Sequence, residues 1–348
     1  MPIVTTEHFK NGNLPLSKNG IPQVSDDDYY RLRGYKLEKD DIVFSRVGSI
    51  DINAHVEQSQ QGWLFSGRVL RVRPIKSVNS LCLHYILSTE SVKRSIRNRA
   101  VGQTMPSINT PILSNTKINI PQSVVEQKKI ANLLALLDKR IAIQNKIIED
   151  LKKLKCAIIE KLYAEVKGTK YSYRQLFNII NERNKQLEYS NVLSASQEKG
   201  MVSRDDLNLD IQFERSNINT YKIVKNGDYV IHLRSFQGGF AFSEKTGVCS
   251  PAYTILRPNG LLVYGYLSYY FTSREFIQSL IIVTYGIRDG RSINVDEWLD
   301  MKVVIPSKEQ QSHIVNVIKS IENKIKNEET YSNCLLKQKQ YLLRQMFI

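Results

Sequence analysis

The longest regular pattern of hydrophobic positions in the chain lies between Ser123 and Tyr163. Apolar residues recur there at alternating intervals of three and four: Leu134, Leu137, Ile141, Ile148, Leu151, Ile158 and Leu162. Gln144 and Lys155 occupy the two remaining positions of the series. This spacing, uninterrupted by glycine or proline, is typical of a coiled-coil helix with one narrow apolar seam. Because one helix cannot bury such a seam alone, the pattern predicts a long partner helix.

A second segment of the same kind lies at the end of the sequence. Its apolar positions each lie 184 residues after a counterpart in the first segment: Ile318, Ile321, Ile325, Leu335, Leu342 and Met346. The match extends upstream at nearly the same offset, because residues 102–109 and 118–121 resemble residues 286–294 and 303–306. Two unrelated amphipathic helices would not share these flanking motifs. The sequence therefore predicts a tandem repeat of one globular domain followed by one long helix.

The repeat divides the chain into four segments. We predict a first domain over residues 1–121, a first long helix over 122–165, a second domain over 166–306 and a second long helix over 307–348. The second domain opens with residues 170–189, for which the first domain has no counterpart. We therefore expect the first domain to lack its opening segment.

Each domain is predicted to be of mixed α/β type. Residues 41–45 and 69–73 have the β-branched content and partial alternation of strands, and residues 81–99 are predicted to form one helix. If the two domain–helix units are related by a pseudo-two-fold axis, the long helices must run in opposite directions. The expected fold class is α+β, with two mixed α/β domains separated by an antiparallel pair of long coiled-coil helices.

The charge of the chain points to a polyanionic partner. The formal net charge is +15, and between Glu57 and Glu126 the only acidic residue is Glu90. The same stretch contains nine basic residues: Arg68, Arg71, Arg73, Lys76, Lys93, Arg94, Arg97, Arg99 and Lys117. A solvated surface with few acids is the alternative explanation. A field of this kind would attract a phosphate backbone, with counterion release favouring binding.

Cysteine usage and hydropathy indicate the compartment. The four cysteines are scattered with no C-x-x-C pair, and the five histidines have no metal-ligand spacing. We therefore expect no metal site and a reducing, cytoplasmic environment. The sequence has no apolar run long enough to span a membrane and no signal-peptide start.

Candidate DNA-reading residues lie in turns and loops that occur in both halves. Arg46 and Ser49 lie in a small-residue turn after a predicted strand, and Arg234 occupies the same place in the second half. Such a turn can present a guanidinium and backbone N–H groups to a phosphate or a base edge. An ordinary hairpin with an exposed arginine is the alternative. In the basic stretch, Arg68, Arg97 and Arg99 are further candidates.

The loops over residues 102–109 and 286–294 provide the remaining candidates. Gln103 could pair with adenine, and Arg288 or Arg291 with guanine, through bidentate hydrogen bonds in the major groove. These residues differ between the two copies, as expected if each domain reads its own sequence. For Asn109 and Asn294, which recur unchanged, we favour a structural role in which they cap and anchor the following strand.

No arrangement of residues predicts catalysis. The sequence contains neither a phosphate-binding G-x-x-x-x-G-K-[ST] loop nor paired carboxylates followed by lysine in a nuclease arrangement. Residues 250–253 share a proline and an aromatic residue with the motif of adenine methyltransferases, but lack its second proline. We interpret them as a turn entering a strand.

The order of motifs resembles the specificity subunit of type I restriction–modification systems. The first copy carries Ile120-Pro121, Glu126-Gln127, Ile130-Ala131 and Leu137-Asp138. The second carries Ile305-Pro306, Glu309-Gln310, Ile314 and Ile321-Glu322. The resemblance extends over essentially the whole chain and depends on the duplication of these motifs in a fixed order.

This resemblance implies a subunit that selects double-stranded DNA and catalyses nothing itself. Two modification subunits would methylate adenine with S-adenosylmethionine, and restriction subunits would translocate and cut DNA with ATP and Mg²⁺. No cofactor is expected on this chain. Each globular part would be a target-recognition domain that reads one half-site. The helices would set the gap between half-sites and dock the modification subunits.

Two alternatives stay open at the level of sequence. One is a non-catalytic basic adaptor that binds RNA or DNA without a methyltransferase partner, for which no bipartite target is expected. The other is a nuclease whose active site has no recognisable motif, which metal-dependent cleavage by the purified chain would reveal.

Overall fold

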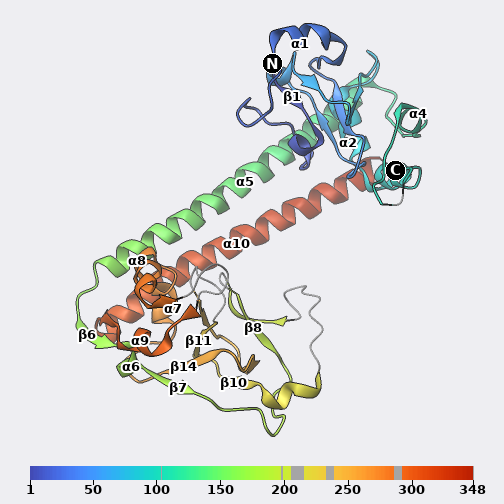
Figure 1. The fold of residues 1–348 in the computed structure, drawn as a ribbon. Helices are drawn as coiled ribbons and strands as arrows, with labels where there is room; N and C mark the ends of the chain where they lie inside the picture. Colours follow the sequence, from blue (N-terminus) through green and yellow to red (C-terminus); the bar gives the residue numbers. More distant parts are fainter. Residues whose placement is uncertain (103, 197–198, 205–214, 233–238, 286–291, 348) are drawn as a thin grey trace. The chain divides into compact units, whose positions relative to one another are not determined.

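The computed structural model describes residues 1–348 except 103, 197–198, 205–214, 233–238, 286–291 and 348. It divides into two compact units (Figure 1): unit 1 comprises residues 1–146 and 329–348, and unit 2 comprises residues 147–328. Each long helix contributes one part to each unit. The predicted repeat of a mixed α/β domain with long helices is confirmed.

Unit 1 is built from short strands and helices. Its strands are β1 (Ile3–Val4), β2 (Ile42–Ser45), β3 (Asn53–His55), β4 (Leu64–Phe65) and β5 (Val69–Val72). Its short helices are α1 (Asp26–Arg31), α2 (Ser80–Leu87), α3 (Glu90–Arg97) and α4 (Thr110–Ser114), with 3₁₀ turns at Thr6–Phe9, Arg33–Tyr35 and Gln58–Gln60. The long helix α5 (Val124–Ala164) begins here.

Unit 2 contains more strands. They are β6 (Thr169–Ser172), β7 (Phe177–Ile180), β8 (Leu193–Ser196), β9 (Gly200–Ser203), β10 (Lys222–Val224), β11 (Tyr229–Ile231), β12 (Phe240–Phe242), β13 (Gly247–Cys249), β14 (Thr254–Pro258), β15 (Thr284–Tyr285), β16 (Ser292–Ile293) and β17 (Lys302–Ile305). Its helices are α6 (Tyr173–Leu176), α7 (Tyr266–Tyr270), α8 (Arg274–Ser279) and α9 (Val295–Asp300), with 3₁₀ turns at Arg215–Thr220 and Leu280–Val283. The second long helix is α10 (Lys308–Met346).

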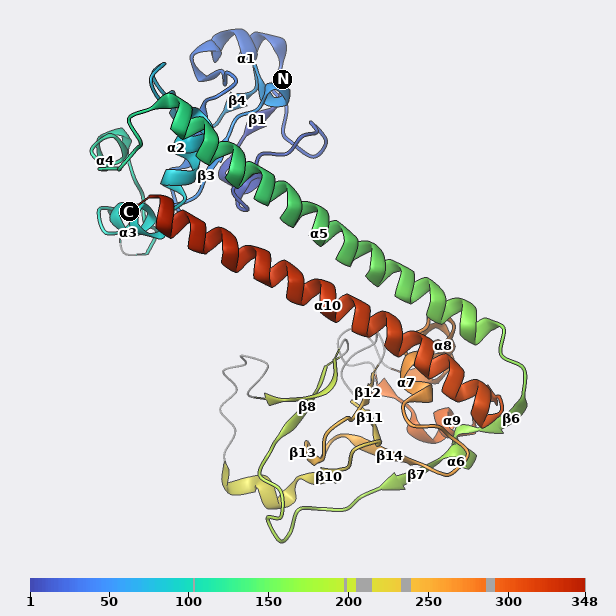
Figure 2. The same ribbon diagram turned by 180° about the vertical axis from the view of Figure 1, so that it is seen from behind.

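The sheet of unit 1 has a core on both faces. Its strand order is β3-β2-β5, all antiparallel. Figure 2 shows α2 beside β3 of this sheet. Because successive side chains of a strand point to opposite faces, Ile42 and Phe44 share one core with residues of α2 and α3, whereas Val43 packs with Trp63 in the second core. The sheet is therefore buried on both sides, although its strands are short.

Unit 2 repeats this arrangement. In the sheet β12-β11-β14-β7, Tyr229 and Ile231 of β11 face one core, and Val230 faces the other. In unit 2 β6 pairs with β17 and β7 pairs with β14. Within the described residues of unit 1, β5 pairs with a strand along one edge only. Whether unit 1 lacks an opening segment stays a prediction.

The long helices pair in antiparallel fashion within each unit. In unit 1, Leu137 and Ile141 of α5 are buried against Leu335 of α10. In unit 2, the buried residues are Ile159 and Tyr163 rather than the predicted Ile158 and Leu162, which are half-buried. Ile159 and Tyr163 belong to the core of unit 2, so the buried face at this end of α5 is shifted by one residue from the predicted seam.

The predicted single helix over residues 81–99 is wrong, because it is divided into α2 and α3. At the break, the Ser88 hydroxyl donates to the carbonyl of His84 at 2.8 Å, and the Thr89 hydroxyl donates to that of Ile86 at 2.7 Å. The backbone N–H groups of Ser88 and Thr89 donate to the same two carbonyls, and Thr89 then adopts an extended conformation (φ −69, ψ 147) that interrupts the helix. None of the described helices is both long and apolar enough to cross a membrane.

Burial of His84 makes stability depend on pH. The His84 ring lies in the core beside Asn53, with Nδ1 2.7 Å from Oδ1, and burial lowers its pKa to about 3. Between this value and the ordinary 6.5, the unfolded chain binds a proton that the folded chain excludes. Stability is therefore lost as the pH falls below 6.5.

We expect the free energy of unfolding of unit 1 to fall by about 1–2 kcal/mol between pH 7 and pH 5. The His84→Gln variant keeps an amide that can donate to Asn53 and should flatten this dependence. Urea unfolding can be followed through Trp63 after Trp298, the second tryptophan, is replaced by phenylalanine. If the free energy of unfolding depends equally on pH in the wild-type chain and in the His84→Gln variant, the assignment of this dependence to His84 is contradicted.

Candidate nucleic-acid interface

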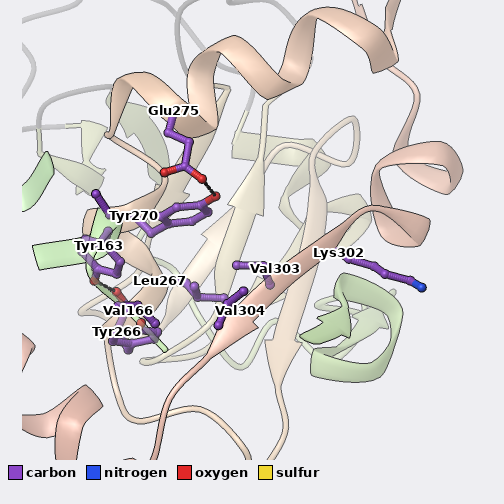
Figure 3. Close-up of a pocket in the computed structure, with 10 residues that line it drawn as sticks. Tyr163, Val166, Tyr266, Leu267, Tyr270, Glu275, Lys302, Val303 and Val304 are labelled. Carbon is purple, nitrogen blue, oxygen red and sulfur yellow. Dashed lines mark hydrogen bonds between the residues drawn. The ribbon is translucent and has the colours of Figure 1, made fainter. Parts of the chain in front are cut away.

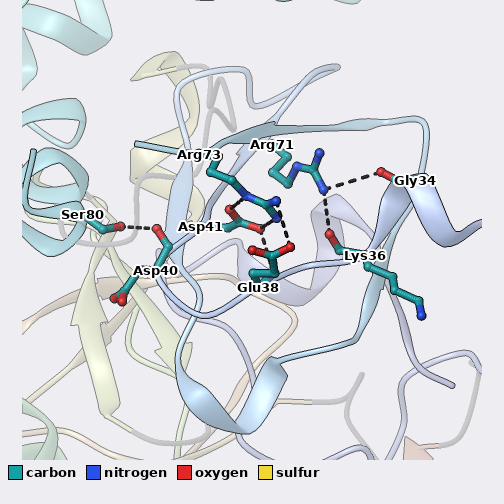
Figure 4. A network of polar contacts seen from close by, with 8 residues as sticks. All are labelled: Gly34, Lys36, Glu38, Asp40, Asp41, Arg71, Arg73 and Ser80. Atoms are coloured by element: carbon teal, nitrogen blue, oxygen red, sulfur yellow. Dashed lines mark hydrogen bonds and ion pairs between the residues drawn. The ribbon is translucent and has the colours of Figure 1, made fainter. Parts of the chain in front are cut away.

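Two arginines of the basic stretch form hydrogen bonds with other residues of unit 1. Arg73 forms a bidentate pair with the buried Asp41, with Nε–Oδ1 and Nη2–Oδ2 distances of 2.7 and 2.8 Å (Figure 4). Its Nη1 reaches Glu38 at 2.9 Å, and Arg71 Nη1 donates to the Lys36 carbonyl at 2.7 Å. The hydrogen bonds to Asp41 raise the pKa of Arg73. Both side chains therefore stabilise unit 1, and we exclude them from the candidate interface.

The same ion pair occurs in unit 2. Arg257 Nε and Nη2 donate to the two carboxylate oxygens of the buried Asp228 at 2.9 and 2.8 Å. In the sequence, residues 39–43 align with residues 226–230, which places Asp41 and Asp228 at equivalent positions. Recurrence of an aspartate before each strand was the sequence signal for this structural role.

The turn after β2 brings separate candidates together. The backbone N–H of Arg46 donates to the Arg68 carbonyl at 3.0 Å, and the Ile108 N–H donates to the Arg46 carbonyl at 2.9 Å. Gly48, which adopts the left-handed conformation with φ +79, donates to the Pro106 carbonyl at 2.9 Å. The turn over residues 46–49 and the described loop residues 101–102 and 104–108 therefore form one edge of unit 1, which we call the turn–loop edge.

Arginine side chains at the turn–loop edge are available to a ligand. Arg46 and Arg68 are exposed, and Arg46 makes one long hydrogen bond, from Nη1 to the Gly67 carbonyl at 3.3 Å. Ser49 is exposed on the same turn. A guanidinium has five donors, so most donors of Arg46 can bind phosphate oxygens or base edges. Arg46, Ser49 and Arg68 form the part of the predicted site that the described residues bring together.

Arg97 and Arg99 have partners inside unit 1. The Arg97 guanidinium pairs with Asp51 and Glu90, and hydrogen bonds to these carboxylates raise its pKa. Arg99 Nη1 donates to the Asn115 carbonyl at 2.7 Å. Both side chains are exposed, so DNA could still contact them, and their place in the interface stays a prediction.

Four predicted contacts cannot be placed, because Gln103, Arg234, Arg288 and Arg291 lie outside the described residues. The two asparagines have the capping role that we favoured, but the element that follows each of them is a short helix, α4 or α9, and not the predicted strand. Asn109 Oδ1 accepts from the Ile112 N–H at 2.9 Å, and Asn294 Oδ1 accepts from the Glu297 N–H at 3.4 Å. Each asparagine caps a short helix, which removes it from the candidate interface.

Unit 1 also contains a basic groove that the sequence pattern did not predict. It lies between α3 and the last turns of α10, and Lys93, Arg94 and Arg344 line it together with Leu343 and Phe347. Arg344 comes from a distant part of the sequence, so only the tertiary fold places it beside the basic end of α3. Among the described residues, no cluster of histidine, cysteine, aspartate and glutamate could hold a metal ion.

The tyrosine-rich part of unit 2 belongs to its core. A cavity there is lined by Tyr163, Tyr266 and Tyr270 with Glu275 (Figure 3). Tyr163 donates its hydroxyl hydrogen to the Tyr266 carbonyl, and burial raises the pKa of Tyr270 to about 12. Tyr266 is only 1% exposed, so its ring cannot stack on a base.

Comparison with known proteins finds a family model that matches part of the chain. The model of the "Type I restriction modification DNA specificity domain" family matches residues 1–153. The resemblance drawn from the repeated motifs is thereby confirmed.

Two curated relatives come from Methanocaldococcus jannaschii. The putative type I restriction enzyme MjaX specificity subunit is 31% identical over 172 residues, which are 47% of this chain and 39% of the relative. The type I restriction enzyme MjaVIII specificity subunit is 33% identical over 87 residues, which are 25% and 20%. The chain therefore matches less than half the length of these relatives.

Solved structures support the fold over a longer range. A structure described as the basis of complex assembly and conformational transition of the type I R-M system has a TM-score of 0.61 and 14% identity, covering 89% of this chain and 82% of that one. The S subunit of a type I restriction–modification system from M. genitalium has a TM-score of 0.55 and 14% identity, covering 99% and 91%. Both likenesses concern the fold, and they confirm the predicted fold class.

Replacing both Arg46 and Arg68 by alanine should weaken binding of double-stranded DNA by about tenfold or more at low salt. Loss of about two phosphate contacts should also reduce the slope of log K against log salt concentration by roughly two. Fluorescence anisotropy across a salt series measures both quantities. Arg31→Ala, which removes an exposed arginine of α1 paired with Asp28, is the matched control. Equal losses in both variants would contradict a specific role for the turn–loop edge.

Proposed function

We propose that this chain is the DNA-binding specificity subunit of a type I restriction–modification complex. The observation that carries the proposal is that unit 2 reproduces contacts of unit 1, the part of the chain that matches the DNA specificity domain. Gln127 at the start of α5 illustrates this repetition. Its side chain accepts from the Asn79 N–H at 2.7 Å and donates to the Pro121 carbonyl at 2.7 Å. Gln311 in α10 makes the same two bonds with Val263 and Pro306.

Two similar domains in one chain suit a bipartite target. In this proposal each unit is a target-recognition domain that reads one half-site. The turn–loop edge serves unit 1, and the corresponding turn and loop, which include Arg234, Arg288 and Arg291, serve unit 2. Arg46 and Arg68 supply phosphate or base contacts, and the net charge of +15 favours association with DNA.

The chain itself would not catalyse a reaction. Partner subunits would supply the chemistry: two modification subunits methylating adenine with S-adenosylmethionine, and restriction subunits using ATP and Mg²⁺. The chain would act in the cytoplasm, where these partners and DNA meet. An adaptor that binds RNA or DNA without a methyltransferase partner is the rival function. It predicts affinity set mainly by salt and no bipartite motif.

The long helices have a surface suited to a partner. On α5, five large apolar side chains recur at intervals of three, four and seven, and therefore share one face. They are at least 41% exposed: Leu133, Leu136, Ile143, Ile147 and Leu154. This exposed apolar face is distinct from the seam that packs on α10. We propose that helices of the modification subunits pack on it.

Adenine methylation should be mapped across the genome of cells that produce this chain together with its matching modification subunit. We expect a new motif of two short blocks separated by a fixed gap, because each unit would read one block. Cells producing the modification subunit alone provide the control. An unchanged methylation pattern, despite stable co-purification of the two proteins, would exclude the proposed function.

Leu136→Glu should abolish or strongly reduce co-purification with the modification subunit, because it places a charge in the exposed apolar face. Ala142→Glu adds the same charge to another exposed face of α5 and should leave co-purification unchanged. Size-exclusion chromatography of the mixed proteins measures the complex. Retention of the complex by both variants would rule out docking on this face.

A further inference from the structure

A three-residue polar contact joins the globular part of unit 1 to both long helices. The Tyr85 hydroxyl of α2 donates to Asp138 Oδ2 of α5 at 2.8 Å. Lys339 of α10 donates from Nζ to the other oxygen of the same carboxylate. The ammonium nitrogen also lies 5.5 Å from the centroid of the Tyr85 ring. We call this triad lock 1.

Unit 2 contains the same triad with the two helices exchanged. The Tyr269 hydroxyl of α7 donates to Glu322 Oε2 of α10 at 2.8 Å. Lys155 of α5 donates to the other oxygen of Glu322 at 3.3 Å. In this triad, lock 2, α10 supplies the carboxylate and α5 supplies the lysine. Each lock therefore requires both helices and one tyrosine of its own globular part.

The two locks define one register of the helix pair. Lys155 follows Asp138 by 17 residues on α5, and Glu322 precedes Lys339 by the same 17 residues on α10. A third contact fits this register. The Ser332 hydroxyl, seven residues before Lys339, donates at 2.9 Å to Asn145, seven residues after Asp138.

Apolar seams alone do not fix a register, because their pattern repeats every seven residues. A slip of one heptad in one direction would place Asp138 opposite Ser332 and Lys155 opposite the buried Val315. A slip in the other direction would place Asp138 opposite Met346. Either slip breaks lock 1 and leaves charged groups without partners. The locks therefore specify the register that the seam leaves open.

The locks contribute more to geometry than to stability. Their charged side chains are between 26% and 39% exposed, so solvent screens the ion pairs. Burial, followed by the nearby carboxylate, raises the pKa of both tyrosine hydroxyls, which therefore stay protonated donors at neutral pH. A tyrosine hydroxyl that donates to a carboxylate already bound by a lysine fixes both the distance and the direction of the tyrosine relative to the two long helices.

Lock 1 is connected to the turn–loop edge by packed structure. Tyr85 lies on α2, and Ile86 of the same helix packs in the core with Ile42 and Phe44 of β2. Arg46 follows directly at the end of β2. A displacement of Tyr85 along α5 would therefore move the residues that we assign to DNA reading.

We propose that locks 1 and 2 are positioning elements that hold each recognition domain at one place along the helix pair and thereby set the gap between half-sites. The proposal rests on the proposed function. It assigns a role in specificity to Tyr85 and Tyr269, neither of which needs to touch DNA.

Gap selectivity is the first test. Binding is measured on DNA duplexes that contain the two sequence blocks found by methylation mapping. The blocks are separated by the natural gap or by a gap one base pair longer or shorter. Tyr85→Phe, which removes only the hydroxyl, should reduce the preference for the natural gap at least threefold. Affinity for the natural gap and base preference within each block should change less than twofold. Lys153→Gln, which removes an exposed ion pair within α5, is the control and should keep the preference.

The second test needs no DNA and separates failure of this proposal from failure of the proposed function. Spin labels are placed on the exposed Cys334 of α10 and on Lys76→Cys before α2, with the other exposed cysteine, Cys156, replaced by serine. All labelled positions used lie in unit 1. Tyr85→Phe and Asp138→Asn should broaden the distance distribution, and Lys153→Gln should not.

An unchanged distribution in both lock variants would overturn the proposal. So would broadening without any loss of gap preference, or equal weakening on every duplex, because either result assigns the locks a structural role only. If no bipartite motif exists, the proposed function fails and gap setting fails with it. The spin-label distances then still report whether the locks hold the domain in place.

Discussion

The structure depends on the burial of the apolar seam between α5 and α10. Neither helix can remove its seam from water alone, and each globular part needs the helices to complete its core. In unit 2, Ile159 and Tyr163 of α5 join Ile314 and Ile318 of α10 in the core of the domain. In unit 1, Ala131 of α5 joins the core under α2. Because helix pairing and domain folding bury shared residues, disrupting one should weaken the other.

Polar contacts add the specificity that apolar burial lacks. The two copies have diverged in their cores, yet the buried aspartate–arginine pairs, the glutamine contacts at the helix starts and the locks recur in both units. A buried carboxylate or amide that loses its partner carries a large desolvation penalty, whereas one apolar side chain can replace another of similar volume. This difference explains why the repeat is clearest at its polar positions.

The basic residues differ in role according to their partners. Arg71, Arg73 and Arg257 have partners inside the protein, whereas Arg46 and Arg68 are directed to solvent at the turn–loop edge. Net charge alone cannot make this distinction. It attracts a polyanion over a distance, but a guanidinium group that already binds the protein retains fewer donors for phosphates and bases.

The sequence by itself determined the repeat, the seam and the absence of catalytic motifs, because hydrophobic periodicity and motif order are local in the chain. Tertiary structure alone decided which basic residues have internal partners, because Asp41 and Arg73 meet only when β2 pairs with β5. It also divided the helix over residues 81–99, where Thr89 adopts an extended conformation and the Ser88 and Thr89 hydroxyls donate to carbonyls of α2. The locks depend on both the sequence and the tertiary structure. Their residues repeat in the sequence, but only antiparallel pairing brings Asp138 to Lys339 and Glu322 to Lys155, residues that are far apart in the chain.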